Sequence, residues 1–216
     1  MAEEISERLK GRIITVFCSS SSMVAPVYFQ AAQELGQLMA QAGAGLVYGG
    51  TYIGLMGAVS RAVREGGSIT IGVIPASLRQ IGLADEHLTE LIVTDGMRER
   101  KAQMELRGDA FIALPGGYGT LEEFFEIVTA KQLGFHSKAI VLLNTNGYYN
   151  PLLAQVKEAV EQEFMKPNSL ELFYVAETPT EALGYIAHYQ PEDYQQKWFK
   201  PPVIPTTEEG EVPGSE

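Results

Sequence analysis

The sequence has little of what disulfides and metal sites are made of. It contains one cysteine, Cys18, and three scattered histidines, His87, His136 and His188, in 216 residues. A single cysteine forms no internal disulfide, which is typical of the reducing cytoplasm. No cluster of these residues has the spacing of metal ligands, so we expect no metal ion.

Long apolar runs and positive charge are also scarce. No apolar run approaches the ~20 residues that span a bilayer, and the opening residues are acidic where a secretory signal would be basic and then apolar. We therefore predict a cytoplasmic protein without a membrane partner. The 27 acids outnumber the 16 bases, for a net charge of -11. So acidic a chain is a poor partner for nucleic acid, although a local basic pocket can hold one small anion.

What the sequence does have is an alternation of short apolar runs and helical patterns. We predict strands at residues 12–18, 45–48, 69–74, 88–93, 109–114, 138–143 and 172–175. We predict helices at residues 27–41, 97–107, 151–164 and 180–188, and two more that open at glycine turns and end near residues 66 and 133. Strands that are apolar on both faces and separated by helices form a parallel sheet covered on both sides.

The predicted fold class is therefore α/β, a single Rossmann-like domain with a doubly wound parallel sheet and helices on both faces. We place this domain at residues 12–190, after an N-terminal extension at residues 1–11. Residues 191–216 form an acidic tail rich in proline and glycine, for which we expect disorder.

The run LPGGYGTLEE at residues 114–123 ends a predicted strand, makes a glycine turn and opens a helix. Glycines let the backbone approach an anion, and a helix start offers unpaired N–H groups, so the run predicts a phosphate site. A structural alternative stays open. Thr120 and Glu123 also match a T-x-x-E capping box, a device worth about 1 kcal/mol to the helix.

Two further loops follow predicted strands, and all three should converge at the carboxyl ends of the sheet. The serines at residues 19–22 can bond a phosphate, a ribose or a base edge, or simply fill a turn and cap the next helix. The glycine turn at residues 49–54 has neither the spacing of the dinucleotide fingerprint nor a Walker lysine. Nicotinamide dehydrogenase and P-loop interpretations are weakened by this.

The run MRERKAQM at residues 97–104 packs three cations into four residues at a helix start, where cations oppose the helix dipole. An anionic substrate is one candidate for holding them there, because the arginine fork suits phosphate or ribose. The alternative is a solvated face in which the cations pair with Glu99 and Glu105.

Together, PGGYGTLEE and MRERKAQM, with CSSSS, LVYGG and GLMGAVSRAV upstream, resemble the LOG (LONELY GUY) cytokinin-activating phosphoribohydrolases, which are often labelled lysine decarboxylases. The resemblance covers about residues 13–180. It implies hydrolysis of the N-glycosidic bond of a purine nucleoside 5'-monophosphate, either AMP or an N6-modified form. The products would be a free base and ribose 5-phosphate. It also implies no cofactor and a homodimer or larger homo-oligomer.

On this resemblance the catalytic residues are Arg100 and Glu123. The residues expected to bind substrate are Ser20, Gly49, Gly50, Met97, Arg98, Lys101, Gly116, Gly117, Tyr118, Gly119, Thr120, Leu121, Glu122 and Thr129. Three positions depart from the family pattern: Thr51, Gly82 and Arg98. These departures leave open how the base is selected.

Two alternatives to this activity remain. A non-catalytic nucleotide-binding or sensor module fits the same fold, because a scaffold does not specify an activity. A pyridoxal-phosphate lysine decarboxylase needs a Schiff-base lysine, and Lys101 beside Arg100 suits a phosphate ligand better. The presence of both Arg100 and Glu123 favours the phosphoribohydrolase.

Overall fold

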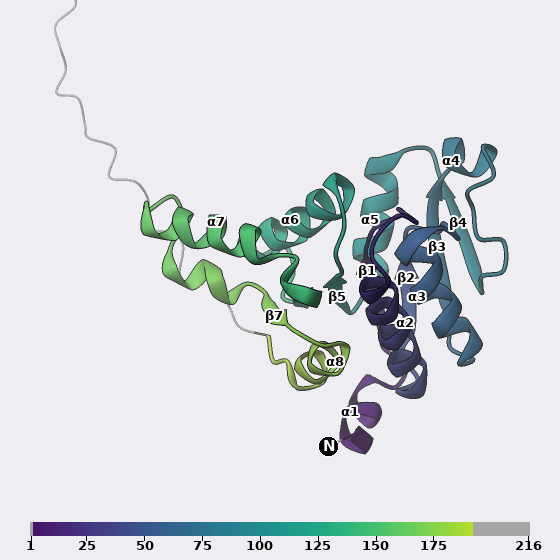
Figure 1. Cartoon of the computed structure of the whole chain (residues 1–216), viewed down its shortest axis with the longest axis horizontal. Helices are drawn as coiled ribbons and strands as arrows, with labels where there is room; N and C mark the ends of the chain where they lie inside the picture. Colours follow the sequence, from purple (N-terminus) through teal and green to yellow (C-terminus); the bar gives the residue numbers. More distant parts are fainter. Residues whose placement is uncertain (1, 192–216) are drawn as a thin grey trace, which may run out of the picture.

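A computed structural model describes residues 2–191 and forms them into one parallel sheet covered by helices on both faces (Figure 1). The strands are β1 (Ile13–Phe17), β2 (Gly45–Tyr48), β3 (Thr70–Pro75), β4 (Glu90–Thr94), β5 (Ala110–Ala113), β6 (Ala139–Leu143) and β7 (Tyr174–Ala176). Their order is β4-β3-β2-β1-β5-β6-β7, and every neighbouring pair is parallel. The chain thus winds outward from β1 to β4 and then from β5 to β7, which confirms the predicted α/β, doubly wound fold.

Helices connect the strands. They are α1 (Ala2–Leu9), α2 (Pro26–Gln41), α3 (Gly54–Glu65), α4 (Ala76–Gln80), α5 (Met97–Arg107), α6 (Tyr118–Gln132), α7 (Asn150–Glu161) and α8 (Pro179–His188), with 3-10 turns η1 (Thr145–Gly147) and η2 (Pro167–Glu171). Every predicted strand and helix is present. The sequence patterns missed α1, α4 and the two 3-10 turns, which are too short to show a clear apolar period.

Local sequence explains several element boundaries. The β-branched run of β1 suits a central strand that pairs with β2 and β5. Helix α2 begins at Pro26, whose fixed φ fits the first helical turn. Just after its last turn, Gly43 has a φ of +68°, a left-handed conformation that commonly ends helices.

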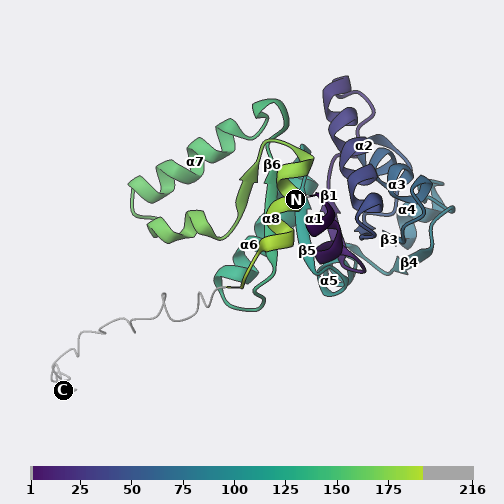
Figure 2. The ribbon, with the colours of Figure 1, turned by 90° about the horizontal axis from the view of Figure 1, so that it is seen from below.

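Two apolar layers hold the helices to the sheet. One face carries α1, α2, α3 and α8, with Leu9, Leu35, Leu55 and Leu183 in its core. The other face carries α5, α6 and α7, with Met104, Phe124, Ile127 and Leu152 packed on the strands. Figure 2 shows α2 and α3 side by side on their face of the sheet. The sheet therefore lies between two apolar layers.

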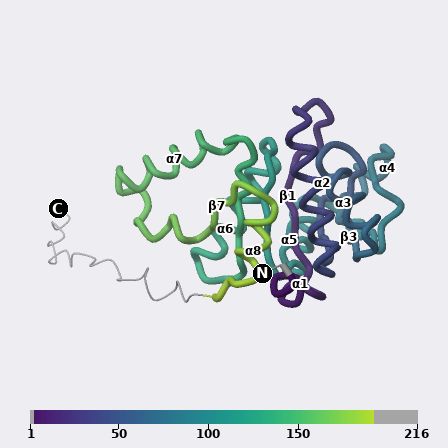
Figure 3. The backbone as a smooth tube through the Cα atoms, turned by 60° about the horizontal axis from the view of Figure 1, so that its bottom comes forward, coloured from purple at the N-terminus to yellow at the C-terminus, as the bar shows by residue number. Residues whose placement is uncertain are grey.

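The predicted N-terminal extension forms α1, which packs against α8 near the other end of the described chain (Figure 3). Leu9 of α1 is fully buried in the first apolar layer. The predicted acidic tail lies outside the described residues, apart from residue 191. Among the helices of residues 2–191, none combines the length and apolar character of a membrane span.

Candidate active site

A cavity of about 480 Å³ lies where the strand order reverses between β1 and β5. Three loops form much of its wall: residues 19–21 after β1, Gly49 and Thr51 after β2, and residues 117–120 after β5. This confirms that the three predicted loops converge. In open α/β sheets the switch point at the carboxyl ends of the strands is the usual ligand site.

A buried ion pair lies in this cavity. Arg100 Nη1 donates a hydrogen bond of 2.6 Å to Glu123 Oε1, and the two side chains are only 5% and 4% exposed. Arg100 Nε donates to the Val73 carbonyl of β3 at 3.0 Å, which fixes the guanidinium from a second side. A Cβ at Gly49 would overlap Arg100 Nη2, so glycine after β2 makes room for this arginine. The predicted catalytic residues are thus held together, from α5 and α6.

The environment of this pair sets the protonation of Glu123. Burial raises the pKa of Glu123 above its ordinary value, and the charge and hydrogen bond of Arg100 only partly offset that rise. Burial, together with the charge of Glu123, also raises the pKa of Cys18, so this thiol stays neutral in the cavity wall. A carboxyl with a raised pKa in a cavity is a candidate for proton transfer at moderate pH.

The glycine turn leaves a row of unused amides at the start of α6. Gly117 occupies the N-cap position, and the first intrahelical bond runs from Leu121 N–H to the Gly117 carbonyl at 3.0 Å. Within the described part of the chain, no acceptor pairs with the N–H groups of residues 116–120. Residues 117–120 also line the cavity. Such a row of free donors at the positive end of a helix is suited to binding an anion.

The alternative interpretation of Thr120 as the first half of a capping box is wrong. Thr120 is the third residue of α6 instead of its N-cap, because the extended backbone of Gly117 takes that position. The Thr120 side chain instead packs against Gly116, where a Cβ would overlap its Oγ1 and Cβ atoms. Thr120 therefore does not cap the amide of Glu123.

The two neighbouring glycines provide a matched test of this turn. We expect Gly116→Ala to lower the free energy of unfolding by about 1–3 kcal/mol, because the new methyl group overlaps Thr120. Gly117→Ala is expected to have less effect, because its Cβ would meet no atom within 4 Å and its φ of -90° lies outside the left-handed region that requires glycine. Urea denaturation of both variants checks this. Equal stabilities would contradict the packing described.

Lys101 next to the arginine faces a different set of acids. Its Nζ pairs with Glu122 and, at 2.9 Å, with Glu126, both on α6. Burial alone would lower the pKa of Lys101, but the hydrogen bonds to these two carboxylates outweigh it and raise the pKa. Arg100 and Lys101 therefore pair with acids of α6, whereas Arg98 is exposed. The alternative pairing with Glu99 and Glu105 is wrong, since Glu99 instead accepts from the Asp95 amide.

The structure brings some predicted substrate-binding residues to the cavity and leaves others outside its wall. On the wall lie Ser20, Gly49, Met97, Gly117, Tyr118, Gly119 and Thr120. Outside it lie Gly50, Arg98, Lys101, Gly116, Leu121, Glu122 and Thr129. Arg98 and Thr129 are exposed, whereas Gly50 is buried at a φ of +74° against β3. Binding roles for both groups stay predictions.

One wall of the cavity is apolar, and most of it was missed from sequence. Besides Met97, it is formed by Ile53, Met56, Leu78 and Leu83. Leu78 belongs to α4 and Leu83 to the loop that follows. A five-residue helix gives no periodic signal, so no pattern pointed to these side chains. Of the family departures, Thr51 lines the cavity, while Gly82 is exposed and does not.

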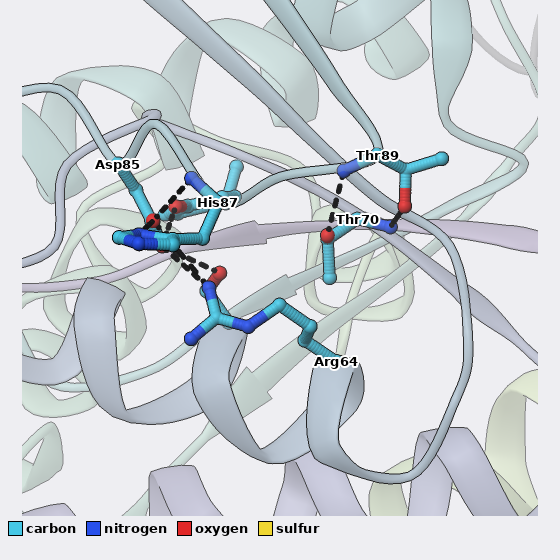
Figure 4. A network of polar contacts seen from close by, with 7 residues as sticks. Arg64, Thr70, Asp85, His87 and Thr89 are labelled. Atoms are coloured by element: carbon cyan, nitrogen blue, oxygen red, sulfur yellow. Dashed lines mark hydrogen bonds and ion pairs between the residues drawn. The ribbon is translucent and has the colours of Figure 1, made fainter.

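Asp85 anchors the loop that carries Leu83. Its buried carboxylate accepts hydrogen bonds from Tyr48 Oη at 3.3 Å, Ser60 Oγ at 3.4 Å and Arg64 Nη1 at 3.3 Å. Figure 4 shows Arg64 of α3 reaching Asp85, and farther along the loop Thr70 and Thr89 exchange hydrogen bonds. The Asp85 amide also donates to the Gly50 carbonyl at 2.9 Å. This acid fixes the apolar wall relative to the β2 loop, and nothing in its sequence surroundings indicated that role.

The site offers little support for a metal or a Schiff base. Among residues 2–191 no group of three histidine, cysteine or acidic side chains is placed to hold a metal ion. Lys101, the lysine beside Arg100, is held by Glu122 and Glu126 and does not line the cavity. A Schiff-base lysine must present a free amine to its cofactor, so Lys101 does not fit pyridoxal phosphate.

Solved structures share this architecture. The molybdenum cofactor binding protein from the phototrophic bacterium Rippkaea orientalis superposes with a TM-score of 0.63 at 26% identity, over 82% of this chain and 96% of that one. The protein TM1055 superposes with a TM-score of 0.65 at 22% identity, over 82% and 99%. At such identity the second likeness shows the fold alone.

Sequence relatives are closer. A family model described as "Possible lysine decarboxylase" matches residues 56–186. The cytokinin riboside 5'-monophosphate phosphoribohydrolase LOG3 of Arabidopsis thaliana is 45% identical over 188 residues, 87% of this chain and 87% of that protein. The "Probable cytokinin riboside 5'-monophosphate phosphoribohydrolase LOGL2" of Oryza sativa subsp. japonica is 45% identical over 181 residues, which cover 84% of this chain and 74% of that protein. The chain therefore belongs to the LOG family, whose curated members are phosphoribohydrolases and not pyridoxal-phosphate decarboxylases.

Proposed function

We propose that this chain hydrolyses the N-glycosidic bond of purine nucleoside 5'-monophosphates, both AMP and its N6-modified forms, to free base and ribose 5-phosphate. The observation that carries the proposal is the buried Arg100–Glu123 pair in the same cavity as the unpaired amides of α6. The names of the curated relatives support the same activity.

The spacing along α6 suits a ribose phosphate. In this proposal the 5'-phosphate lies on the amides of residues 116–120, with the positive end of the helix dipole behind them. Glu123 follows Thr120 by three residues and so lies on the same helix face, with its Cβ tilted back toward the helix start. At about 1.5 Å rise per residue, Glu123 lies about 6–9 Å beyond the first amides. The phosphate ester, C5' and ribose ring together bridge that distance, with the Glu123 side chain reaching back toward C1'.

The chemistry needs the carboxylate form of Glu123. As the bond between C1' and the base nitrogen breaks, its electron pair leaves with the base and positive charge develops on the ribose, as in glycoside hydrolysis. The Glu123 carboxylate stabilises that charge and accepts a proton from the water that attacks C1'. Glu123 then gives that proton up, and the departing base is protonated, so that water supplies the hydroxyl on C1' and the hydrogen on the base and Glu123 is again a carboxylate. Arg100 orients the carboxylate and favours its ionised form.

The apolar wall supports substrates with an N6 substituent. Met56, Leu78, Leu83 and Met97 line the cavity that holds the Arg100–Glu123 pair. An isoprenoid group on the adenine would bury its methyl groups against such side chains, at roughly 0.8 kcal/mol per buried CH₂. We infer that prenylated AMP is preferred over AMP.

The predicted homo-oligomer and cytoplasmic location stay predictions.

The kcat for hydrolysis should fall at acid pH as Glu123 is protonated, with an apparent pKa above 4.5. Glu123 acts as a carboxylate, and burial raises its pKa above the ordinary value of 4.5, so falling pH protonates it earlier than an exposed glutamate. The measurement is kcat against pH. The substrate phosphate has a pKa of its own of about 6. The pH dependence of ribose 5-phosphate binding is therefore measured separately, so that titration of the phosphate can be distinguished from titration of Glu123. An acid limb at or below pH 4.5 would contradict the assignment.

A side-by-side rate comparison tests the proposed substrate class. Purified protein is incubated with AMP, N6-prenylated AMP, GMP and CMP, and the free base is quantified by chromatography. The proposal predicts the highest kcat/KM for prenylated AMP, then AMP, with CMP far below. Release of no base from any of them, with nucleotide still bound, would favour the alternative of a non-catalytic nucleotide-binding module.

A further inference from the structure

Two adjacent tyrosines outside the cavity wall contact the main chain of the glycine turn. Tyr148 and Tyr149 follow η1, beyond the end of β6. Tyr148 Oη donates a hydrogen bond of 2.8 Å to the Gly116 carbonyl, and Tyr149 Oη donates one of 2.6 Å to the Leu114 carbonyl. Tyr149 is 2% exposed and Tyr148 is 42% exposed. Both contacts join segments more than thirty residues apart in the chain.

The carbonyl between these two is also bonded from outside the turn. Ser19 N–H donates to the Pro115 carbonyl at 3.3 Å, so three successive carbonyls, of residues 114–116, have partners. In a trans peptide the C=O and the next N–H point in opposite directions. The Ser19 contact therefore sets the direction of the Gly116 amide, and the Tyr148 contact sets that of the Gly117 amide. Glycine would otherwise let these planes rotate easily.

The tyrosines are themselves held in place. The Asn144 side chain accepts a hydrogen bond from the Tyr149 amide at 2.7 Å and donates one to Asn150 at 2.9 Å. The Tyr148 ring packs edge to face on Tyr28, at 5.8 Å between centroids, and on Tyr149, at 5.0 Å. Because both tyrosine side chains are held in place, their hydrogen bonds also restrict the orientation of the Gly116 and Leu114 carbonyls.

We propose that Tyr148 is a positioning residue for phosphate binding, which acts by holding the Gly116–Gly117 peptide with its N–H toward the cavity. Tyr149 differs in one respect. The Leu114 carbonyl shares its peptide with Pro115, which has no N–H, so Tyr149 anchors the turn without aiming a donor. The inference rests on the proposed function, in which this turn binds the 5'-phosphate.

The difference between the two tyrosines gives a matched experiment. Binding of ribose 5-phosphate is measured by calorimetry for the wild-type protein and for Tyr148→Phe, Tyr149→Phe and Tyr174→Phe. Tyr174 is the control, because its hydroxyl bonds Glu181 at the β7 edge of the sheet and does not contact the turn. We expect Tyr148→Phe to weaken binding about three- to tenfold. Tyr149→Phe should mainly lower the melting temperature, and Tyr174→Phe should bind like the wild type.

Kinetics with AMP supply a second readout. The phosphate is remote from the bond that breaks, so Tyr148→Phe should raise KM by a similar factor and leave kcat nearly unchanged. If the wild type binds ribose 5-phosphate and Tyr148→Phe binds it equally well, the role of Tyr148 is overturned while the proposed function stands. An equal loss in Tyr174→Phe would also overturn it. If the wild type does not bind ribose 5-phosphate, both proposals fail.

Discussion

Glu123→Gln is expected to lower kcat for nucleotide hydrolysis by about 10²–10⁴-fold, the usual contribution of a general base, while the chain keeps its fold. The amide neither carries the negative charge that stabilises the ribosyl cation nor accepts a proton from water. The fold should tolerate it, because the net shift of the Glu123 pKa is upward. Relative to water, the folded environment therefore favours the neutral side chain over the ionised one.

Circular dichroism and thermal unfolding establish the fold of this variant, and release of free base from AMP gives kcat. The matched control is Glu34→Gln, an exposed position on α2 with the same change of charge. Nucleotide binding should persist in Glu123→Gln, because the amides of residues 116–120 are untouched. Turnover at the wild-type rate would remove Glu123 from the mechanism.

Arg100→Ala should weaken both substrate binding and rate, and should move the acid limb of the kcat profile to higher pH. Arg100 lowers the pKa of Glu123 against the larger effect of burial, so its loss lets burial raise that pKa further. Arg100→Lys should not restore activity. A single ammonium cannot reproduce the planar fork that bonds Val73 and Glu123 at once.

The measurement is kcat against pH for the wild type, for Arg100→Ala and for the control Arg107→Ala. Arg107 lies on the same helix but pairs with Glu90 at the far end of α5, so its profile should match that of the wild type. Unchanged kinetics in Arg100→Ala, or an acid limb that does not move, would refute the role assigned to Arg100.

Much of the fold was predictable, because its signals are local and repeated. Apolar runs such as residues 45–48 and 139–143 are bounded by glycine or polar residues and separated by helical patterns, which indicates a parallel sheet. Topology then requires the loops after β1, β2 and β5 to meet. The start of α6 was harder to predict. The T-x-x-E pattern allows Thr120 to be the N-cap, but the extended backbone of Gly117 makes that residue the N-cap instead.

The contacts that build the site could not be derived from spacing. Arg100 and Glu123 are 23 residues apart, and only the family resemblance paired them. Asp85 lies in a polar loop and meets Arg64 only after α3 and that loop fold together. Tyr148 reaches Gly116 across 32 residues. Each of these pairings depends on how helices and loops from distant parts of the chain are brought together by the fold, and no local sequence pattern indicates that.

The most direct test of the account is to identify the bond that is cleaved. N6-prenylated AMP is incubated with the wild-type protein and with Glu123→Gln, and all products are quantified. We predict that the wild type releases free base and ribose 5-phosphate in equal amounts and that Glu123→Gln releases neither at a comparable rate. Release of nucleoside and inorganic phosphate, or tight binding of the nucleotide without any product, would contradict the proposed function.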